Sequence, residues 1–398
     1  MSGNVPSIRF SGFTDPWEQR KAGEIFTIYD DRNHADLPVL SASQGEGMVL
    51  RDEMGRNISY DHSNEKNYKR VKPGSFVIHL RSFQGGFAHS PIEGIVSPAY
   101  TVFEAIDETN QCDRFWKHLF MSKRFVQALT IVTYGIRDGR SINVDEFLEM
   151  PLSYPAYPEQ VDIGQTIDRL DNLITLHQRE CDRLEKVRAS LMQSMFPQPG
   201  ETLPSIRFAE FTKPWHSKQL GSLVTPFDHR IPTPTDGYVR LGVRSFAKGT
   251  FLQDVPAEQA IGETELREVG PNNLIVNIVF AWEQAIAITS EADTIALVSH
   301  RFPQFSFNDG QCPDFYRYAL LDPRFRHHLW LASPSGAGRN KTLRVDEMLE
   351  YWILVPSFEE QRAIADFFAA FDRSLDARRR LCEALGHVKN ALLSSMFV

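Results

Sequence analysis

The sequence contains an internal duplication, and this feature limits the possible folds more than any other. Four segments of the first half return in the same order in the second half: residues 6–10 as 204–208, 111–112 as 311–312, 144–149 as 345–350 and 194–196 as 395–397. The offset is 198 residues at the first pair and 201 at the last two. Cys181 likewise matches Cys382. We therefore expect two copies of one folding unit of about 200 residues.

The composition is that of a folded protein with a buried core, since 42% of the residues are hydrophobic and 24% are charged. No apolar run reaches the 18 or so residues of a membrane helix, and the first residues lack the apolar segment of a signal peptide. We therefore expect a cytoplasmic protein whose four cysteines are reduced thiols. The net charge of −8 argues against coating nucleic acid by charge alone, although local basic regions would still permit DNA contact.

The first 150 or so residues of each unit are rich in β-branched and aromatic residues, glycine and proline. Short apolar runs predict strands at 76–80, 101–103, 274–276 and 286–288. Residues 113–130 and 313–331 favour helices instead. Each unit should therefore contain a mixed α and β domain, and the fold class of the chain should be α+β.

The last 40 residues of each unit differ, because apolar residues recur there at alternating spacings of four and three. This pattern predicts long helices at 158–197 and 358–398, domains at 1–157 and 204–357, and a linker at 198–203. The predicted seam comprises Ile163, Ile167, Leu170, Ile174, Cys181, Leu184, Leu191 and Met195, and in the second copy Ile364, Phe368, Phe371, Leu375, Cys382, Leu385, Leu392 and Met396. Polar residues interrupt it at equivalent steps: His177, Arg188, Arg378 and Lys389. So long a stripe needs a partner helix, and we expect the two copies to pack together, with the cysteines as small apolar residues.

Several short motifs resemble catalytic sites but lack essential parts. Residues 336–342 resemble the end of a phosphate-binding loop, yet Asn340 precedes Lys341 and the spacing GxxxxGK[ST] is absent. Residues 15–17 resemble part of a methyltransferase loop, but Lys213 replaces the carboxylate in the second copy, so we interpret Trp17 as a core residue. Serine–lysine patterns at 63–66 and 245–248 lack companion motifs. We expect no catalytic residue, no metal site and no cofactor of the chain's own.

Positive charge is concentrated in three stretches that contain no Asp or Glu, which are residues 66–92, 114–137 and 323–345. A solvated protein face explains any single run of this kind. These runs, however, lie beside glycine-rich polar sequence at 81–86, 135–140 and 335–341. Arg, Gln, Asn and Ser side chains read base edges, and such loops can approach a DNA groove. The stretches therefore indicate candidate DNA-binding loops.

On these features the chain resembles the specificity subunits of type I restriction-modification systems. The resemblance extends over nearly the whole chain, and its strongest motif opens the second helix as Pro356-x-x-x-Glu360-Gln361-x-x-Ile364-Ala365. The first copy keeps Glu159-Gln160-x-x-Ile163 but has Gly164 at the last position. Further shared pieces are 204–215, 72–76, 280–283 and 345–347.

The resemblance implies a non-catalytic subunit with two target recognition domains in a pseudo-twofold arrangement, separated by two antiparallel long helices. Each domain would read one half of a bipartite double-stranded DNA target, while the helices fix the spacer. The implied partners are two methyltransferase (modification) subunits and the restriction/translocase subunits. S-adenosylmethionine and ATP would then be bound by these partners, and no membrane would be involved.

The candidate DNA-binding residues follow from the basic loops, mostly as phosphate anchors and in a minority as base readers. They are Lys69, Arg70, Arg81, Gln84, Tyr134, Arg137, Arg140, Arg244, Lys248, Arg339, Asn340 and Lys341. Two alternatives remain open at this point. A protein–protein scaffold without DNA readout would use the same helices and fits the negative charge, and a self-contained enzyme would need a cofactor motif that the sequence lacks.

Overall fold

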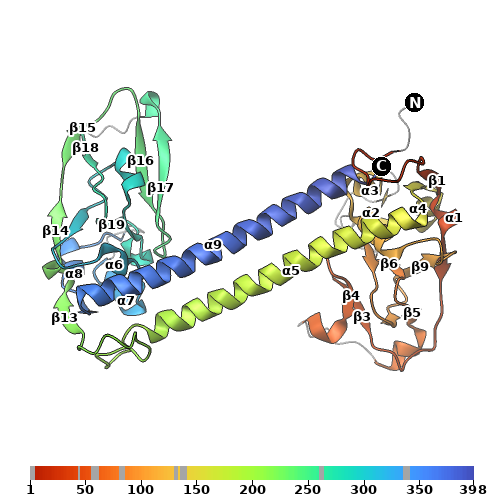
Figure 1. The fold of residues 1–398 in the computed structure, drawn as a ribbon, viewed down its shortest axis with the longest axis horizontal. Helices are drawn as coiled ribbons and strands as arrows, with labels where there is room; N and C mark the ends of the chain where they lie inside the picture. Colours follow the sequence, from red (N-terminus) through yellow and green to blue (C-terminus); the bar gives the residue numbers. More distant parts are fainter. Residues whose placement is uncertain are drawn as a thin grey trace. The chain divides into compact units, whose positions relative to one another are not determined.

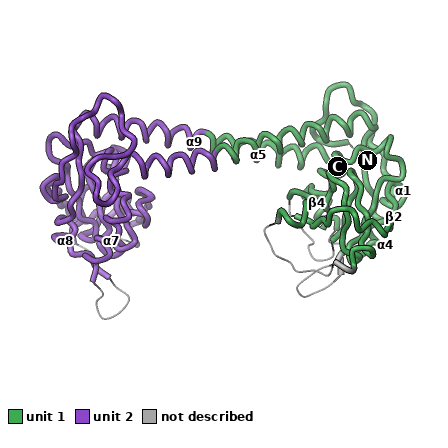
Figure 2. Tube along the Cα trace, turned by 90° about the horizontal axis from the view of Figure 1, so that it is seen from below, with its two compact units in different colours: residues 1–180, 378–398 green, residues 181–377 purple. Residues whose placement is uncertain are grey.

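The computed structural model describes residues 5–43, 45–54, 62–79, 86–129, 133–134, 141–259, 264–334 and 341–398. The chain divides into two compact units, which Figure 2 shows in different colours. Unit 1 comprises Met1–Glu180 with Arg378–Val398, and unit 2 comprises Cys181–Ala377. Each unit therefore holds one of the predicted domains together with a part of both long helices, whereas the sequence pattern had separated helices from domains.

Unit 1 is a mixed fold of short strands and short helices (Figure 1). Its strands are β1 (Glu18–Lys21), β2 (Phe26–Tyr29), β3 (Leu40–Ser43), β4 (Gly47–Leu50), β5 (Lys69–Val71), β6 (Phe76–Ile78), β7 (Phe87–His89), β8 (Gly94–Val96), β9 (Thr101–Ala105), β10 (Thr133–Tyr134), β11 (Ser141–Ile142) and β12 (Pro151–Tyr154). Its helices are α1 (Ala22–Ile25), α2 (Asp113–Met121), α3 (Lys123–Ala128) and α4 (Val144–Glu149), with 3-10 turns at Arg51–Met54 and His62–Asn67. The strands and helices predicted for this unit are confirmed.

The central sheet of unit 1 is antiparallel, in the order β2-β9-β6-β7. Strand β6 is buried along its whole length, which explains why its sequence is continuously apolar rather than alternating. Phe115, Trp116 and Phe120 of α2 are buried against this sheet, where Phe26 and Phe76 meet them edge to face. Trp17 packs on Phe115, as expected for a core residue.

Unit 2 repeats most of this architecture. Its strands are β13 (His216–Gln219), β14 (Val224–Phe227), β15 (Arg230–Pro232), β16 (Tyr238–Val243), β17 (Thr250–Val255), β18 (Glu265–Glu268), β19 (Leu274–Val276), β20 (Ile286–Ile288), β21 (Leu297–Val298), β22 (Gln304–Phe307) and β23 (Trp352–Val355). Its helices are α6 (Pro313–Ala319), α7 (Pro323–Leu331) and α8 (Val345–Leu349), with 3-10 turns at Leu220–Ser222, Ala257–Gln259, Ala281–Glu283 (η6) and Glu291–Ile295.

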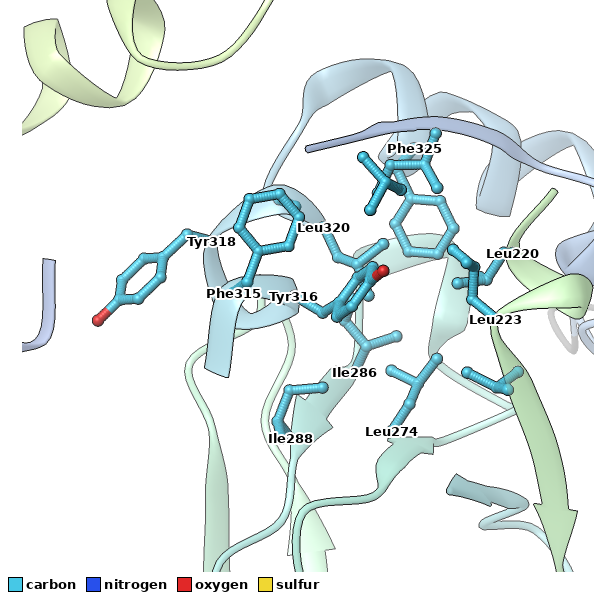
Figure 3. Packing of buried hydrophobic residues seen from close by; sticks show 14 of the residues in the cluster. Leu220, Leu223, Leu274, Ile286, Ile288, Phe315, Tyr316, Tyr318, Leu320 and Phe325 are labelled. Atoms are coloured by element: carbon cyan, nitrogen blue, oxygen red, sulfur yellow. The ribbon is translucent and has the colours of Figure 1, made fainter. Parts of the chain in front are cut away.

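The sheet topology confirms the duplication. The order β14-β22-β19-β20 in unit 2 matches β2-β9-β6-β7 in unit 1, and β13 pairs with β23 as β1 pairs with β12. Figure 3 shows Leu274, Ile286 and Ile288 of the unit 2 sheet facing aromatic side chains of α6. The main departure is a five-stranded sheet, β15-β18-β21-β16-β17, where unit 1 has the separate pairs β3-β4 and β5-β8.

The two long helices are α5 (Tyr157–Ser194) and α9 (Phe358–Ser395), each of 38 residues. Every residue of the predicted seam is buried or half-buried, including Cys181 and Cys382. Within unit 1 the helices run antiparallel, because Lys389 pairs with Asp171 at 2.5 Å and Arg378 pairs with Glu180. Within unit 2, Arg188 pairs with Asp372 at 2.5 Å. The polar steps in the seam are therefore ion-pair positions, which the apolar pattern did not reveal.

The Glu-Gln motif attaches each long helix to its domain. In unit 1, Arg9 donates two hydrogen bonds of 2.7 Å to Glu159, whose side chain is buried. Arg207 makes the same paired contact with buried Glu360 in unit 2. These bonds raise the pKa of both arginines, so the guanidinium charges are fixed beside the carboxylates.

The glutamine that follows bridges two backbone segments. Gln160 accepts a hydrogen bond of 2.9 Å from the Cys112 N–H at the start of α2, and its amide donates to the Pro155 carbonyl. Gln361 repeats both bonds with Cys312 and Pro356. A buried amide that supplies one donor and one acceptor satisfies groups that would otherwise lack partners at a helix start.

Candidate nucleic-acid interface

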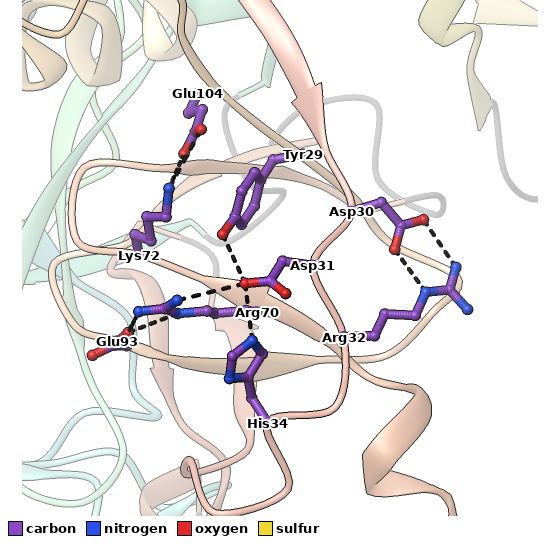
Figure 4. A network of polar contacts seen from close by, with 9 residues as sticks. All are labelled: Tyr29, Asp30, Asp31, Arg32, His34, Arg70, Lys72, Glu93 and Glu104. Carbon is purple, nitrogen blue, oxygen red and sulfur yellow. Dashed lines mark hydrogen bonds and ion pairs between the residues drawn. The ribbon is translucent and has the colours of Figure 1, made fainter.

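In unit 1, two of the predicted DNA-binding cations, Lys69 and Arg70, lie on β5, and Figure 4 shows the polar network around Arg70. Arg70 on β5 donates to Glu93 at 2.8 Å and to Asp31 at 3.5 Å, and the bond to Glu93 is the main cause of its raised pKa. Lys69 donates to the Tyr100 carbonyl at 2.8 Å. Because acids and carbonyls already compensate these charges, a DNA role for either residue stays a prediction.

The glycine-rich loops that contribute most of the other candidates lie outside the described residues. Arg81, Gln84, Arg137, Arg140, Arg339 and Asn340 belong to these segments, as does the side chain of Tyr134. In the chain, residues 80–85 lie between β6 and β7, and residues 335–340 come after α7.

Three described candidates in unit 2 lie against aromatic rings. Arg244 lies 4.9 Å from the ring centre of Phe251 and donates to the Thr250 carbonyl. Lys248 lies 5.8 Å from the ring of Phe246. Lys341 lies 5.3 Å from the ring of Trp282 and 4.7 Å from that of Trp330. Cation–π contacts of this kind hold the ammonium groups near the surface without neutralising their charge.

The structure adds residues that the sequence interpretation did not select. Arg326 lies 5.1 Å from the Phe246 ring, and it shares one face of α7 with Trp330, four positions on. Phe246 and Trp330 are both about half exposed, at 50% and 48%. We call these six residues the aromatic–cation surface of unit 2: Phe246, Lys248, Trp282, Arg326, Trp330 and Lys341. Exposed aromatic residues between basic ones were the sequence feature that could have indicated it.

A cluster of one histidine and two acids in unit 1 has a geometry that a metal could use, since ligand atoms of His118, Asp168 and Asp171 lie within 4.8 Å of one another. Both carboxylates already have cations beside them: Lys117 at 2.8 Å from Asp168 and Lys389 at 2.5 Å from Asp171. Positive groups at these positions oppose a metal ion. The donor set therefore fits a structural junction between α2 and α5, not a metal centre.

Protonation in this junction follows from burial. Burial lowers the pKa of His118, whose side chain is fully enclosed, so the neutral ring donates from Nε2 to Asp168 at 2.9 Å. Burial alone would raise the pKa of Asp168, but the hydrogen bonds from His118 and Lys117 outweigh it and hold that pKa well below its usual range. Unit 2 replaces the histidine with Tyr318, whose hydroxyl donates to Asp372 at 3.1 Å.

With this geometry established, comparison with known proteins is informative. Residues 14–186 match the family model of the type I restriction modification DNA specificity domain. The chain is also similar in fold to the S subunit of a type I restriction-modification system from M. genitalium, with 12% identity, a TM-score of 0.60 and 99% of both chains covered. Residues 14–186 therefore belong to the type I restriction modification DNA specificity domain family, and the chain shares its fold with an S subunit.

Two further solved structures resemble the chain. The HsdS subunit from Thermoanaerobacter tengcongensis shares 14% identity over 97% of this chain and 98% of that chain, with a TM-score of 0.48. A structure described as concerning complex assembly and conformational transition of the type I R-M system shares 14% identity over 96% and 97%, with a TM-score of 0.50. The family match assigns a DNA specificity domain to residues 14–186. None of the described helices is both long and apolar enough to cross a membrane.

Proposed function

We propose that the chain is a specificity subunit whose two units each read one half of a bipartite duplex target, while α5 and α9 fix the unread spacer between the halves. The supporting observation is a contrast within the chain. The contacts that join helix to domain are duplicated residue by residue, whereas the exposed basic and aromatic residues differ between the copies. Two copies that present different side chains from the same framework are suited to reading different bases.

The length of the helices is compatible with a spacer function. Each has 38 residues, which correspond to about 57 Å at 1.5 Å per residue. Half-sites on one face of B-DNA are separated by roughly 34 Å per helical turn. In this proposal the domains 1–157 and 204–357 act as recognition domains in a pseudo-twofold arrangement.

The proposed protein partners are two methyltransferase subunits and the restriction/translocase subunits, which would supply S-adenosylmethionine and ATP chemistry. Apolar side chains on the long helices support docking of a protein, because they point away from the seam and remain exposed. Leu173, Leu176 and Val187 of α5 are 43%, 53% and 41% exposed, and Leu381 and Val388 of α9 are 44% and 48% exposed. Side chains of this kind are typical of surfaces that a partner covers.

Selection from random duplexes tests this proposal against a scaffold that does not read DNA. The full chain, purified with its methyltransferase partner, is incubated with a pool of randomised duplexes, and the retained DNA is sequenced. We expect enrichment of two short, unlike sequence blocks separated by a gap of constant length. Retention without enrichment, or no retention, would contradict the proposal and favour a scaffold.

A further inference from the structure

We propose that Phe246, at the turn between β16 and β17, is a specificity-determining residue that contacts the bases of one half-site, with Lys248 and Arg326 on the adjacent phosphates. This inference rests on the proposed DNA readout and assigns part of it to one side chain. Phe246 was not among the residues that the sequence indicated as DNA-binding.

The backbone of this turn adopts a conformation that its residues disfavour. Phe246 and Ala247 have φ angles of 61° and 49°, in the left-handed region that suits glycine. Hydrogen bonds hold them there, since the Phe246 N–H donates to the Glu283 carbonyl at 2.7 Å and the Ala247 N–H to the Gln284 carbonyl at 2.8 Å. The Ser245 hydroxyl also donates to the Glu283 carboxylate at 2.6 Å. Such conformations persist where the surroundings enforce them, and they cluster at functional sites.

Unit 1 contains the equivalent hairpin with a shorter turn, since Ser43 pairs with Gly47 there, whereas Val243 pairs with Thr250 in unit 2. The hairpin β3–β4 corresponds to β16–β17, because each forms a parallel bridge to an equivalent strand. Val39, next to β3, bridges Ile95 of β8, and Arg240 of β16 bridges Leu297 of β21. In the turn of β3–β4, Gly45 and Gly47 have φ angles of 91° and 82°. The longer turn of unit 2 has Gly249 in the left-handed region as well, but it adds Phe246 and Ala247 there, two residues with side chains.

Packing does not explain the phenylalanine. The Phe246 side chain is 50% exposed, so about half of its surface contributes nothing to the core. Its exposed neighbours along the turn are Arg244 and Lys248, and Arg326 reaches its ring from α7. At the position equivalent to Arg326, unit 1 has Val126. The cation therefore accompanies the aromatic residue in unit 2 and is missing with it in unit 1.

The chemistry of this group fits duplex DNA better than a protein surface. A phenyl ring makes apolar contact with the thymine methyl group or with an opened base step. Two cations near the ring, at 5.8 and 5.1 Å from its centre, would meet the phosphates adjacent to that base. An acidic protein partner is the competing occupant, and it would use the cations without any preference among base pairs.

The test compares binding of the selected target duplex with binding of duplexes altered one base pair at a time, using the full chain with its methyltransferase partner. We expect Phe246→Ala to reduce discrimination about tenfold or more at one or two adjacent positions of a single half-site, and to leave the other half-site unchanged. Lys248→Ala and Arg326→Ala should weaken binding of all duplexes alike. Ile295→Ala is the matched control, since this apolar residue of the same unit is 66% exposed, and it should change neither quantity.

The outcomes separate this inference from the function on which it rests. If the parent complex discriminates between duplexes and Phe246→Ala discriminates equally well, this inference is overturned and the proposed function stands. If the parent binds all duplexes alike, both are overturned. An acidic protein partner would be indicated if the variant lost a protein component of the complex while keeping its base preferences, and this result also overturns the inference.

The melting temperature of Phe246→Gly distinguishes a role in DNA contact from a role in packing. Glycine relieves the left-handed strain, so a residue kept for DNA contact predicts an unchanged or raised Tm together with lost discrimination. A lowered Tm with discrimination retained would show that Phe246 serves packing, and would overturn the inference.

Discussion

The two units share their internal framework and differ at their surfaces. Ile8 donates to the Ser395 carbonyl at the end of α9, and Ile206 donates to the Ser194 carbonyl at the end of α5, so the repeated Pro-Ser-Ile-Arg-Phe segment meets an equivalent helix end in each unit. By contrast, the described left-handed residues at the β3–β4 hairpin of unit 1 are Gly45 and Gly47, whereas the longer turn of unit 2 presents Phe246. Residues that join helix to domain are retained after duplication, and residues that face outward have diverged.

This contrast explains how one framework can serve two readers. The Lys389–Asp171 pair of unit 1 and the Arg188–Asp372 pair of unit 2 occupy equivalent positions in the repeat, so even the polar steps of the seam are duplicated. A framework fixed at this level permits changes in the turns without loss of the fold.

Removing the guanidinium of the Arg–Glu contact should destabilise either unit severely. Arg9→Ala leaves the Glu159 carboxylate, 1% exposed, without its charge partner, and the expected loss is about 3–5 kcal/mol in the free energy of unfolding. Arg207→Ala should cost about 1 kcal/mol less, because the Trp215 indole still donates to Glu360 at 3.2 Å. Trp17 Nε1 has no hydrogen-bond partner among the described residues.

Denaturant unfolding of the two variants beside Arg32→Ala measures this difference. Arg32 forms an exposed pair with Asp30, so its removal should change the free energy of unfolding by less than about 1 kcal/mol. Losses for Arg9→Ala and Arg207→Ala no larger than this control would refute the assigned role of the Arg–Glu contact.

Truncating the bridging glutamine should have an intermediate effect of equal size in both units. Gln160→Ala and Gln361→Ala each remove one acceptor and one donor from buried backbone groups, and the expected loss is about 2–3 kcal/mol. Hydrogen exchange of the N–H groups of Cys112 and Cys312 provides a local measurement. Faster exchange in only one of the two variants would contradict the equivalence of the units.

The stability of unit 1 should depend on pH through His118, which unit 2 replaces with Tyr318. Because burial lowers the pKa of His118 below its usual 6.5, the unfolded chain binds more protons than the folded chain below that pH, and stability falls with decreasing pH. The slope is at most about 1.4 kcal/mol per pH unit for one proton. The contribution of Asp168 is lost only below its usual pKa of 3.8, so it stays constant between pH 7 and pH 5, the range in which the unfolding measurement tests His118.

His118→Tyr copies the unit 2 arrangement, in which the Tyr318 hydroxyl donates to Asp372. Burial raises the pKa of Tyr318, so a tyrosine in this setting stays neutral across the range. The variant should therefore lose less stability than the parent between pH 7 and pH 5. An unchanged slope would show that another group controls the pH dependence.

The cross-helix ion pairs should contribute least, because both are partly exposed to solvent. Lys389→Ala and Arg188→Ala should each cost below about 1 kcal/mol, with a smaller effect at high salt. Exchanging the two charges of the unit 2 pair, as Arg188→Asp with Asp372→Arg, should restore part of the loss. Single-variant losses that do not depend on salt would argue for packing of the side-chain stems instead of charge pairing.

The sequence was sufficient for the parts of the fold that repeat with a period. The spacing of Ile163, Ile167 and Ile364 predicted both helices to within one residue of their observed starts at Tyr157 and Phe358, because a buried stripe requires that spacing. Strands β6 and β19 were likewise predicted from their continuous apolar runs. Periodic burial is a local property, and for this reason it can be read from sequence.

The remaining features depend on contacts between distant segments. Nothing local to Arg70 indicates that Glu93 and Asp31 compensate its charge, and the distance between Phe246 and Arg326 arises only when α7 packs beside the hairpin turn. The Glu-Gln motif was visible in the sequence, but its partners Arg9 and Cys112 are 150 and 48 residues away. Ion pairs and exposed surfaces formed in this way require tertiary structure.

Mapping DNA methylation across the genome of a host that carries this chain and its methyltransferase partner tests the central claim most directly. Two unlike readers held at a fixed separation predict adenine methylation confined to a two-part, non-palindromic motif with a gap of constant length. Methylation at one continuous or palindromic motif, or its absence from any defined motif, would contradict the account.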